Sequence, residues 1–193
     1  MRDDARILRM PSRRQATVED LYRADQKAEI VGGELVLMPA SGALPSFACG
    51  EIFVSLRQYA RRTGRGYALP EGGFLVHLPN RLSFCPDVAF TTTRLLTGKF
   101  IDGAPLLAVE VRSDTDYGLA AEREMAAKRA DYVAAGTLVV WDVDVLQGQI
   151  VRVYRAQNPS MPTVYRRGQQ AEAEPALPGW SMPVDDLFPA PGA

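Results

Sequence analysis

Two acidic residues, Asp87 and Glu110, each interrupt an apolar, strand-like run of the sequence. Asp87 follows Pro86 in the run FCPDVAF, and Glu110 lies in the later run LAVEVRS. A carboxylate inside an apolar strand is costly unless a cation, hydrogen bonds or a metal ion compensate it. If the two strands are neighbours, their acids form an oxygen-rich site suited to Mg²⁺. Such an ion would polarise a phosphodiester and lower the pKa of a water molecule bound to it.

Two basic residues are candidates for the same chemistry. Arg112 lies two residues beyond Glu110, on the same face of a strand, and Lys128 lies on the helix expected to follow. Either could stabilise negative charge on a phosphate. The residues alone leave simpler alternatives open. Glu110 and Arg112 could form a structural ion pair, Lys128 could pair with Glu124 four residues earlier on an exposed helix face, and Asp87 could cap a turn.

The segment from 106 to 144 predicts the scaffold that would position these side chains. Alternating apolar residues over 107–111 predict a strand, the apolar spacing over 119–135 with Gly136 after it predicts a helix, and the β-branched run 138–143 predicts a second strand. A strand, helix and strand in this order favour an α/β fold. In such folds ligands bind near the ends of the strands, where Glu110 lies.

The flanking sequence predicts further elements around this unit. Thr17 and Asp20 have the spacing of a capping box before a short helix, and the Gly32-Gly33 pair predicts a hairpin over 29–38. The remaining predictions are a loop over 40–45, a helix over 46–63, strands over 67–69, 74–78, 83–90 (interrupted by Pro86), 150–154 and 163–166, and a Pro-rich tail attached through Trp180 and Leu187-Phe188.

Composition narrows the function classes. The chain has 193 residues, 47% of them hydrophobic, which fits one globular domain. Its net charge is −1, so any surface that binds nucleic acid must be local. Cys49 and Cys85 lack zinc-site spacing, and the single histidine, His77, excludes mechanisms that need several histidines. No apolar run is long enough to cross a membrane and no signal-peptide core is present, so we expect a cytoplasmic protein with no membrane partner.

The motifs resemble a known nuclease family. Pro86-Asp87 followed by Glu110-Val111-Arg112 resembles the PD-(D/E)XK nuclease motif. Over roughly residues 16–189 the chain is similar to a small bacterial family described as putative restriction endonucleases, formerly a domain of unknown function. The runs that carry the wider resemblance are GGELVLM (32–38), PDVAF (86–90), LAVEVRSDTD (107–116), KRADY (128–132) and AGTLVVWDVD (135–144).

The resemblance assigns roles to individual residues. It implies that Asp87 and Glu110 are metal ligands, that Glu34 extends the metal site, and that Lys128 positions the attacking water or stabilises the transition state. Arg112 stands where the motif has lysine; its pKa is too high for a base, so we expect a phosphate clamp. A second departure is Leu44-Pro45-Ser46, where many relatives carry a histidine.

The resemblance also implies a fold, a reaction and partners. We expect an α/β, restriction-endonuclease-like fold with a mixed central β-sheet flanked by helices and additional β-hairpins, formed by residues 16–189 between a flexible arm (1–15) and a tail (190–193). The expected activity is that of an endodeoxyribonuclease that uses Mg²⁺, or alternatively Mn²⁺, to hydrolyse DNA phosphodiester bonds as a homodimer. The rival hypothesis is a catalytically inactive module of the same fold that binds nucleic acid or protein. An active site should place Asp87 and Glu110 within reach of one cation, whereas an inactive module should lock Glu110 to Arg112 or Lys128.

Overall fold

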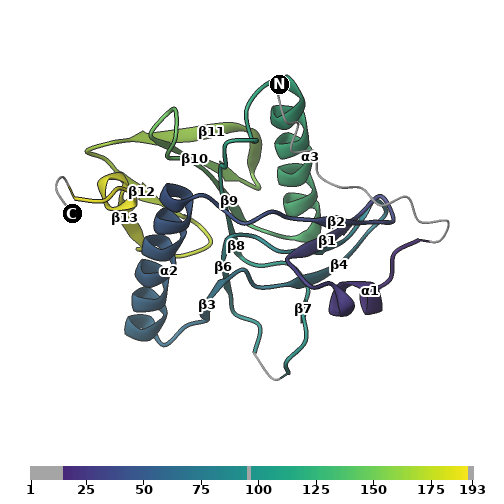
Figure 1. Cartoon of the computed structure of the whole chain (residues 1–193). Helices are drawn as coiled ribbons and strands as arrows, with labels where there is room; N and C mark the ends of the chain where they lie inside the picture. The colour runs from purple at the N-terminus through teal and green to yellow at the C-terminus, as the bar shows by residue number, and fades with distance from the viewer. Residues whose placement is uncertain (1–14, 95–96, 191–193) are drawn as a thin grey trace.

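A computed structural model describes residues 15–94 and 97–190 of the chain (Figure 1). All but the last residue of the predicted arm, and all but the first of the predicted tail, lie outside this part. The helices are α1 (Val18–Arg23), α2 (Ala43–Thr63), α3 (Leu119–Ala135) and the 3₁₀ helix η1 (Val184–Leu187). None of these helices is long and apolar enough to span a membrane.

The larger of two main sheets has six strands, in the order β11-β10-β9-β8-β6-β3. Strands β8 and β9 are parallel, and the other neighbours are antiparallel. Helix α3 connects β8 to β9, so the predicted strand–helix–strand unit is confirmed. The bounds are β3 Tyr67–Pro70, β6 Val88–Thr91, β8 Leu107–Val111, β9 Val139–Asp144, β10 Ile150–Arg155 and β11 Asn158–Arg166.

The second main sheet has five strands, in the order β2-β1-β5-β4-β7, and a small third sheet pairs β12 with β13. Strands β1 and β2 form the predicted hairpin around Gly32-Gly33. The bounds are β1 Ala28–Val31, β2 Glu34–Leu37, β4 Phe74–Leu78, β5 Arg81–Phe84, β7 Ile101–Asp102, β12 Gln170–Glu172 and β13 Ser181–Pro183. The predicted α/β class, with mixed sheets, flanking helices and added hairpins, is confirmed.

The run 83–90 is the point at which the chain passes from one main sheet to the other. The sequence predicts a single interrupted strand there, and this prediction is wrong, because β5 ends at Phe84 and β6 begins at Val88 in a different sheet. Pro86 has no N–H to donate to a strand ladder and restricts the residue before it, so continuous pairing stops. Asp87 therefore lies at the junction of the two sheets.

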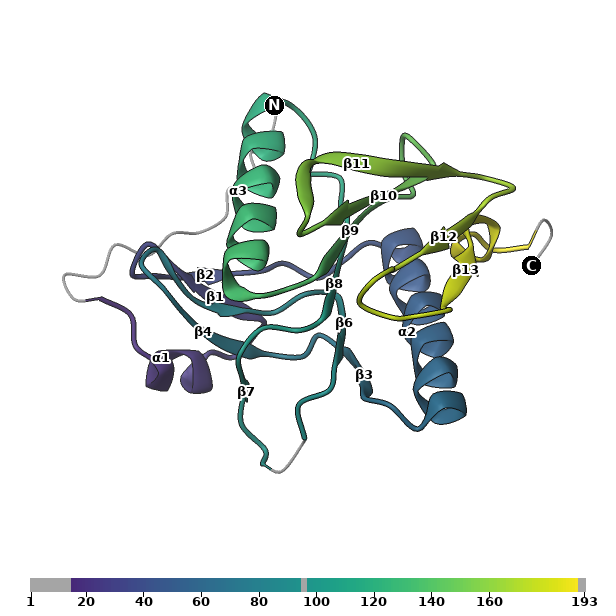
Figure 2. The same ribbon diagram turned by 180° about the vertical axis from the view of Figure 1, so that it is seen from behind.

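Helices α2 and α3 cover opposite faces of the larger sheet, as Figures 1 and 2 show. Helix α2 starts at Ala43, inside the segment predicted as a loop, because Pro45 is compatible with the first turn of a helix. It ends at Thr63, and the next residue, Gly64, has the left-handed conformation typical of helix ends. Its buried residues recur every three or four positions; they are Pro45, Ala48, Ile52, Leu56 and Tyr59. The last four belong to the same core cluster as Val109.

Helix α3 is attached to the sheet in a different way, since Tyr132 is its only fully buried residue among those described. The Tyr132 ring stacks on Phe84, with ring centroids 3.9 Å apart and planes inclined by 15°. Ala135 also packs against this core, and Lys128 and Arg129 of the helix form ion pairs with acids of the sheets. This arrangement turns a polar face of α3 toward the junction of the sheets.

The C-terminal segment packs on the α2 side of the larger sheet. Trp180 lies with its ring centroid 4.9 Å from that of Trp141 in β9, and Leu187 is fully buried. Phe188 packs against the same core, so the predicted attachment of the tail through Trp180 and Leu187-Phe188 is confirmed.

Candidate active site

Asp87 and Glu110 lie next to each other on neighbouring antiparallel strands. Asp87 immediately precedes β6, Glu110 lies in β8, and the ladder between the strands pairs Val88 with Val109. The Asp87 Oδ2 atom accepts a hydrogen bond of 2.8 Å from the Val111 N–H, the amide that follows Glu110. The backbone thus fixes one carboxylate directly beside the residue that carries the other.

Glu110 is held by two residues of α3. Tyr132 donates a hydrogen bond of 2.6 Å from its hydroxyl, and the Lys128 ammonium lies 2.9 Å from the same carboxylate. The two residues are four positions apart and therefore share one helix face. Burial raises the pKa of Glu110, Lys128 opposes this, and the charges of Asp87 and Glu29 add to it, so that the pKa lies above its ordinary value.

Glu29 in β1 is a functional candidate that the sequence analysis missed. Its side chain is only 2% exposed, and it lies 3.0 Å from Lys128 and 2.5 Å from Arg81. It also accepts a hydrogen bond of 2.9 Å from the Cys85 N–H. Burial raises the pKa of Glu29, but these cations and the amide outweigh it and the pKa is lowered. The sequence pattern that could have identified Glu29 is its position between the apolar residues Ala28 and Ile30 of a strand. Glu110 is singled out by the same pattern.

Lys128 is therefore part of the junction rather than an exposed helix residue. Its side chain is 17% exposed and it bridges Glu29 of the smaller sheet and Glu110 of the larger one. Glu124, the alternative partner that the spacing suggested, is exposed on the same helix. The bridge joins both sheets to α3, so it supports the junction as well as any chemistry there.

Glu34 lies next to the turn of the β1–β2 hairpin, and Lys27 lies at the opposite, open end of the hairpin. Glu34 opens β2, opposite Val31, and is not among the described residues that form ion pairs with the junction. Lys27 directly precedes β1, and its ammonium lies 2.7 Å from the Asp87 Oδ1 atom. The structure thus brings Lys27, which the sequence analysis did not consider, to the acids, and leaves Glu34 apart from them.

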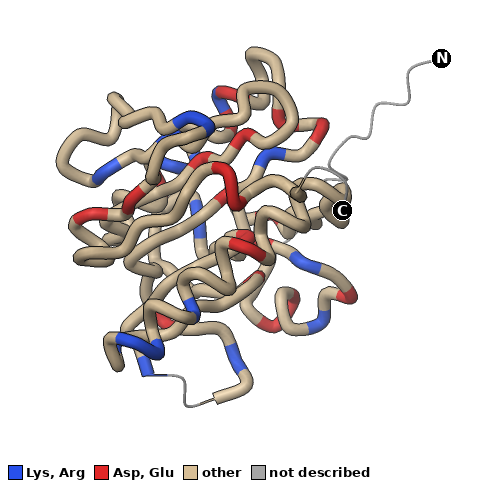
Figure 3. The backbone as a smooth tube through the Cα atoms, turned by 90° about the vertical axis from the view of Figure 1, so that its left-hand side faces the viewer, with Lys and Arg blue, Asp and Glu red and all other residues tan. Residues whose placement is uncertain are grey.

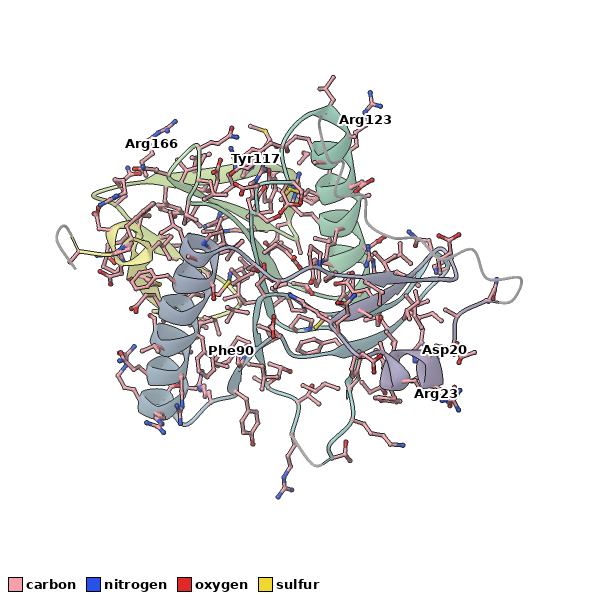
Figure 4. The ribbon with its side chains drawn as sticks, in the orientation of Figure 1. Asp20, Arg23, Phe90, Tyr117, Arg123 and Arg166 are labelled. Atoms are coloured by element: carbon pink, nitrogen blue, oxygen red, sulfur yellow. The ribbon has the colours of Figure 1, made fainter. Side chains whose placement is uncertain are left out.

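Arg112 belongs to a separate, buried cluster of charges. Its guanidinium is 3% exposed and binds both carboxylate oxygens of Asp142, at 2.6 and 2.8 Å, and also pairs with Glu122. Asp142 is 1% exposed and lies opposite Glu110 in the β8–β9 ladder. Tyr117, labelled in Figure 4, lies beside this cluster, with the Arg112 guanidinium 5.7 Å from its ring centroid. With its donors occupied by acids, Arg112 has the geometry of a structural residue.

Basic residues near the end of α2 are solvent-exposed instead. Figure 3, with Lys and Arg in blue, shows several of them at the lower end of the molecule. This set comprises Arg57, Arg61, Arg62 and Arg65. An exposed cluster of this kind is able to contact a phosphate backbone, and it also complements the helix dipole.

The donor set at the junction suits a hard divalent cation. Asp87 and Glu110 supply carboxylate oxygens, the ligand type that Mg²⁺ and Mn²⁺ prefer. Over residues 15–94 and 97–190, no group of three or more His, Cys, Asp or Glu side chains is arranged to hold a metal ion. The pair therefore fits a cation bound through two carboxylates, with water or substrate completing its coordination. In the structure the Lys27 ammonium forms an ion pair with Asp87, one of these two carboxylates.

Comparison with known proteins agrees with the fold and the motifs. The family model "Uma2: Putative restriction endonuclease" matches residues 16–185. A crystal structure of a putative nuclease belonging to DUF820 from Anabaena variabilis ATCC 29413 is similar to the chain, with a TM-score of 0.71 and 17% sequence identity. The similarity covers 90% of this chain and 97% of that one. No curated protein sequence is significantly similar to the chain.

Proposed function

The chain belongs to the Uma2 family of putative restriction endonucleases, and from this we propose that it is a metal-dependent endodeoxyribonuclease that hydrolyses DNA phosphodiester bonds. The family description supports an endonuclease, and the DUF820 neighbour supports the fold. In this proposal Mg²⁺ is the ion, Mn²⁺ substitutes for it, and DNA is the substrate.

The observation that carries this proposal is the position of Asp87 beside Glu110. The Asp87 carboxylate is fixed by the Val111 N–H at 2.8 Å, and Glu110 is fixed by Tyr132 at 2.6 Å. Both acids therefore have defined orientations before any ligand arrives, and such preorganisation favours catalysis. A divalent ion bound to them would supply Lewis-acid activation of the phosphodiester and of a water molecule.

The remaining residues of the junction have supporting roles in this proposal. Lys128 is held between Glu29 and Glu110, so its ammonium has a fixed position from which it stabilises negative charge that develops on the phosphate. Tyr132 orients Glu110. Arg112 stabilises the fold through Asp142 and does not clamp a phosphate, and Glu34 lies apart from the acids that would bind the ion.

We propose a homodimer as the cutting form, because two symmetric active sites cleave both strands of a duplex most simply. The exposed arginines of α2 provide charge for phosphate contacts outside the active site. Contacts of this kind do not depend on base sequence, so they would hold any duplex.

Plasmid cleavage with Mg²⁺ or Mn²⁺ at low salt tests the proposal. The wild-type protein is expected to nick or linearise supercoiled DNA, and Asp87→Asn and Glu110→Gln are expected to lose this activity while remaining folded. Glu124→Gln, which removes an exposed acid from α3, is the matched control and should cleave like the wild type. Cleavage that persists in both site variants would contradict the proposed site.

A second candidate function is the inactive module of the same fold. It is favoured by one observation: both acids already have lysine partners, since Glu110 pairs with Lys128 and Asp87 with Lys27. On this alternative the lysines replace the cation permanently, and the wild-type protein binds nucleic acid or another protein without cleaving DNA under any metal condition. The plasmid assay therefore separates the two candidates.

A further inference from the structure

Lysine is rare in this chain, and its placement is selective. Of 22 basic residues only three are lysines, at positions 27, 99 and 128. Two of these three lie at the junction, where Lys27 pairs with Asp87 and Lys128 with Glu29 and Glu110. Apart from Lys99, the remaining basic residues of the chain are arginines. An ammonium is a compact point charge, closer in size to a metal ion than the planar guanidinium.

The two lysines of the junction are held in different ways. Lys128 lies on a helix and has two carboxylates within 3.0 Å. Lys27 lies in the segment before β1, and Asp87 is the one carboxylate among the described residues that it reaches within ion-pair distance. The Lys27 backbone is fixed, since its carbonyl accepts a hydrogen bond of 2.9 Å from the Met38 N–H. Only the flexible side chain is therefore free to leave Asp87.

The charges of both proposed metal ligands, Asp87 and Glu110, affect the pKa of Lys27. Burial lowers its pKa, but the charges of Asp87 and then of Glu110 outweigh this, so the pKa is raised. Its ammonium lies against Asp87, the acid that the backbone fixes beside Glu110. Its side chain is 15% exposed, which leaves a path to solvent.

We propose that the Lys27 ammonium is a built-in counter-ion that occupies the cation position on Asp87, and that a divalent ion binds there by displacing it. This inference rests on the proposed metal-dependent function and adds a form of regulation to it. Without substrate, the lysine neutralises Asp87 and weakens metal binding. When DNA is present, a phosphate oxygen gives the displaced ammonium a new partner, so metal and DNA bind cooperatively.

Calorimetric titration of Ca²⁺ into the purified protein, with and without a short DNA duplex, tests the inference. Lys27→Met is expected to bind Ca²⁺ on the order of tenfold more tightly than the wild type without DNA, because the competing charge is gone. In Lys27→Met the duplex should strengthen metal binding less than it does in the wild type, because only direct coordination of the ion by a phosphate oxygen remains. Lys99→Met makes the same substitution at an exposed lysine and should behave like the wild type, and Lys27→Arg, which keeps the charge, should show no gain.

A second measurement follows the displacement without any loss of charge. Because the chain has three lysines, the ammonium signals of ¹⁵N-lysine-labelled protein are few, and Lys27→Arg identifies the signal of Lys27. This signal is expected to move or vanish during the Ca²⁺ titration, with the midpoint found by calorimetry, while that of Lys99 stays unchanged. The measurement remains informative if Lys27→Met fails to fold.

The outcomes separate this inference from the function on which it rests. Equal Ca²⁺ affinity in wild type and Lys27→Met, or an unmoved Lys27 signal while Ca²⁺ binds, would overturn the counter-ion role and leave the metal site intact. If no variant binds Ca²⁺, with or without DNA, the metal-dependent function and the inference are overturned together.

Discussion

The hydroxyl of Tyr132 in α3 donates a hydrogen bond of 2.6 Å to Glu110 in β8. The same ring stacks on Phe84, which belongs to the other main sheet. One side chain thus joins the two sheets and orients the acid that lies between them. Chemistry and stability at the junction are linked through this residue.

Tyr132→Phe is expected to separate these two roles, because it keeps the ring and removes the hydroxyl. Loss of a hydrogen bond to a carboxylate should lower the free energy of unfolding by about 1–3 kcal/mol. Urea unfolding measures this change, and Tyr67→Phe, at an exposed tyrosine, is the control. Unchanged stability in Tyr132→Phe would show that the hydrogen bond contributes nothing in solution.

Arg112→Gln tests whether the arginine at the motif's lysine position is structural. The substitution leaves the buried Asp142 with less compensating charge, and breaking a buried pair in this way costs about 3–5 kcal/mol. We expect a large fall in the unfolding midpoint, while the cleavage rate per folded molecule changes little at low temperature. A stable variant with abolished cleavage would instead support the phosphate-clamp role.

The acid limb of the stability curve is expected to depend on Asp144. Burial raises the pKa of Asp144, but hydrogen bonds from the Gln147 N–H, the Tyr117 hydroxyl and the Gly148 N–H outweigh it, so the pKa is lowered. The stabilisation is therefore complete above the unfolded-state pKa of about 3.9 and is lost as the pH falls through the lower folded-state value. Urea unfolding of wild type and Asp144→Asn at several pH values should show a smaller loss in the variant below about pH 4. Parallel curves would refute the assignment.

The thiol of Cys49 should report on the charge of the junction. Burial, followed by the charge of Asp87, raises its pKa to about 12, against an opposing effect of Lys27. Since the thiolate is the reactive form, we expect very slow modification by a disulfide reagent at pH 8. Asp87→Asn should accelerate the reaction at Cys49, whereas Asp102→Asn, at an exposed acid, should not. Fast modification of the wild type would contradict the predicted electrostatics.

Much of the scaffold could be predicted from the sequence because its signals are local. The helix over 119–135 and the hairpin at Gly32-Gly33 are confirmed, since glycine conformations and apolar spacing act over a few residues. The division of the run 83–90 between two sheets could not be predicted, because strand pairing is non-local. Pro86 indicates only that the strand is interrupted, and it does not indicate that the chain passes to another sheet.

The candidate site was predicted only in part, for a related reason. Asp87, Glu110 and Lys128 are brought together as the motif suggested, although their roles stay predictions. Lys27 and Glu29 come from a hairpin about 60 residues before Asp87 in the chain, and no local pattern indicates that this hairpin reaches the junction. The partner of Arg112 was likewise unpredictable, since Asp142 approaches it only when β9 pairs with β8.

Titration of Mg²⁺ by calorimetry into the wild type and Glu110→Gln, each with and without a DNA duplex, tests the central claim most directly. The proposal predicts that the wild type binds the ion, more tightly when DNA is present, and that Glu110→Gln does not bind it under either condition. Absence of Mg²⁺ and Mn²⁺ binding by the wild type, even with DNA, would contradict the metal-dependent nuclease and favour the inactive module.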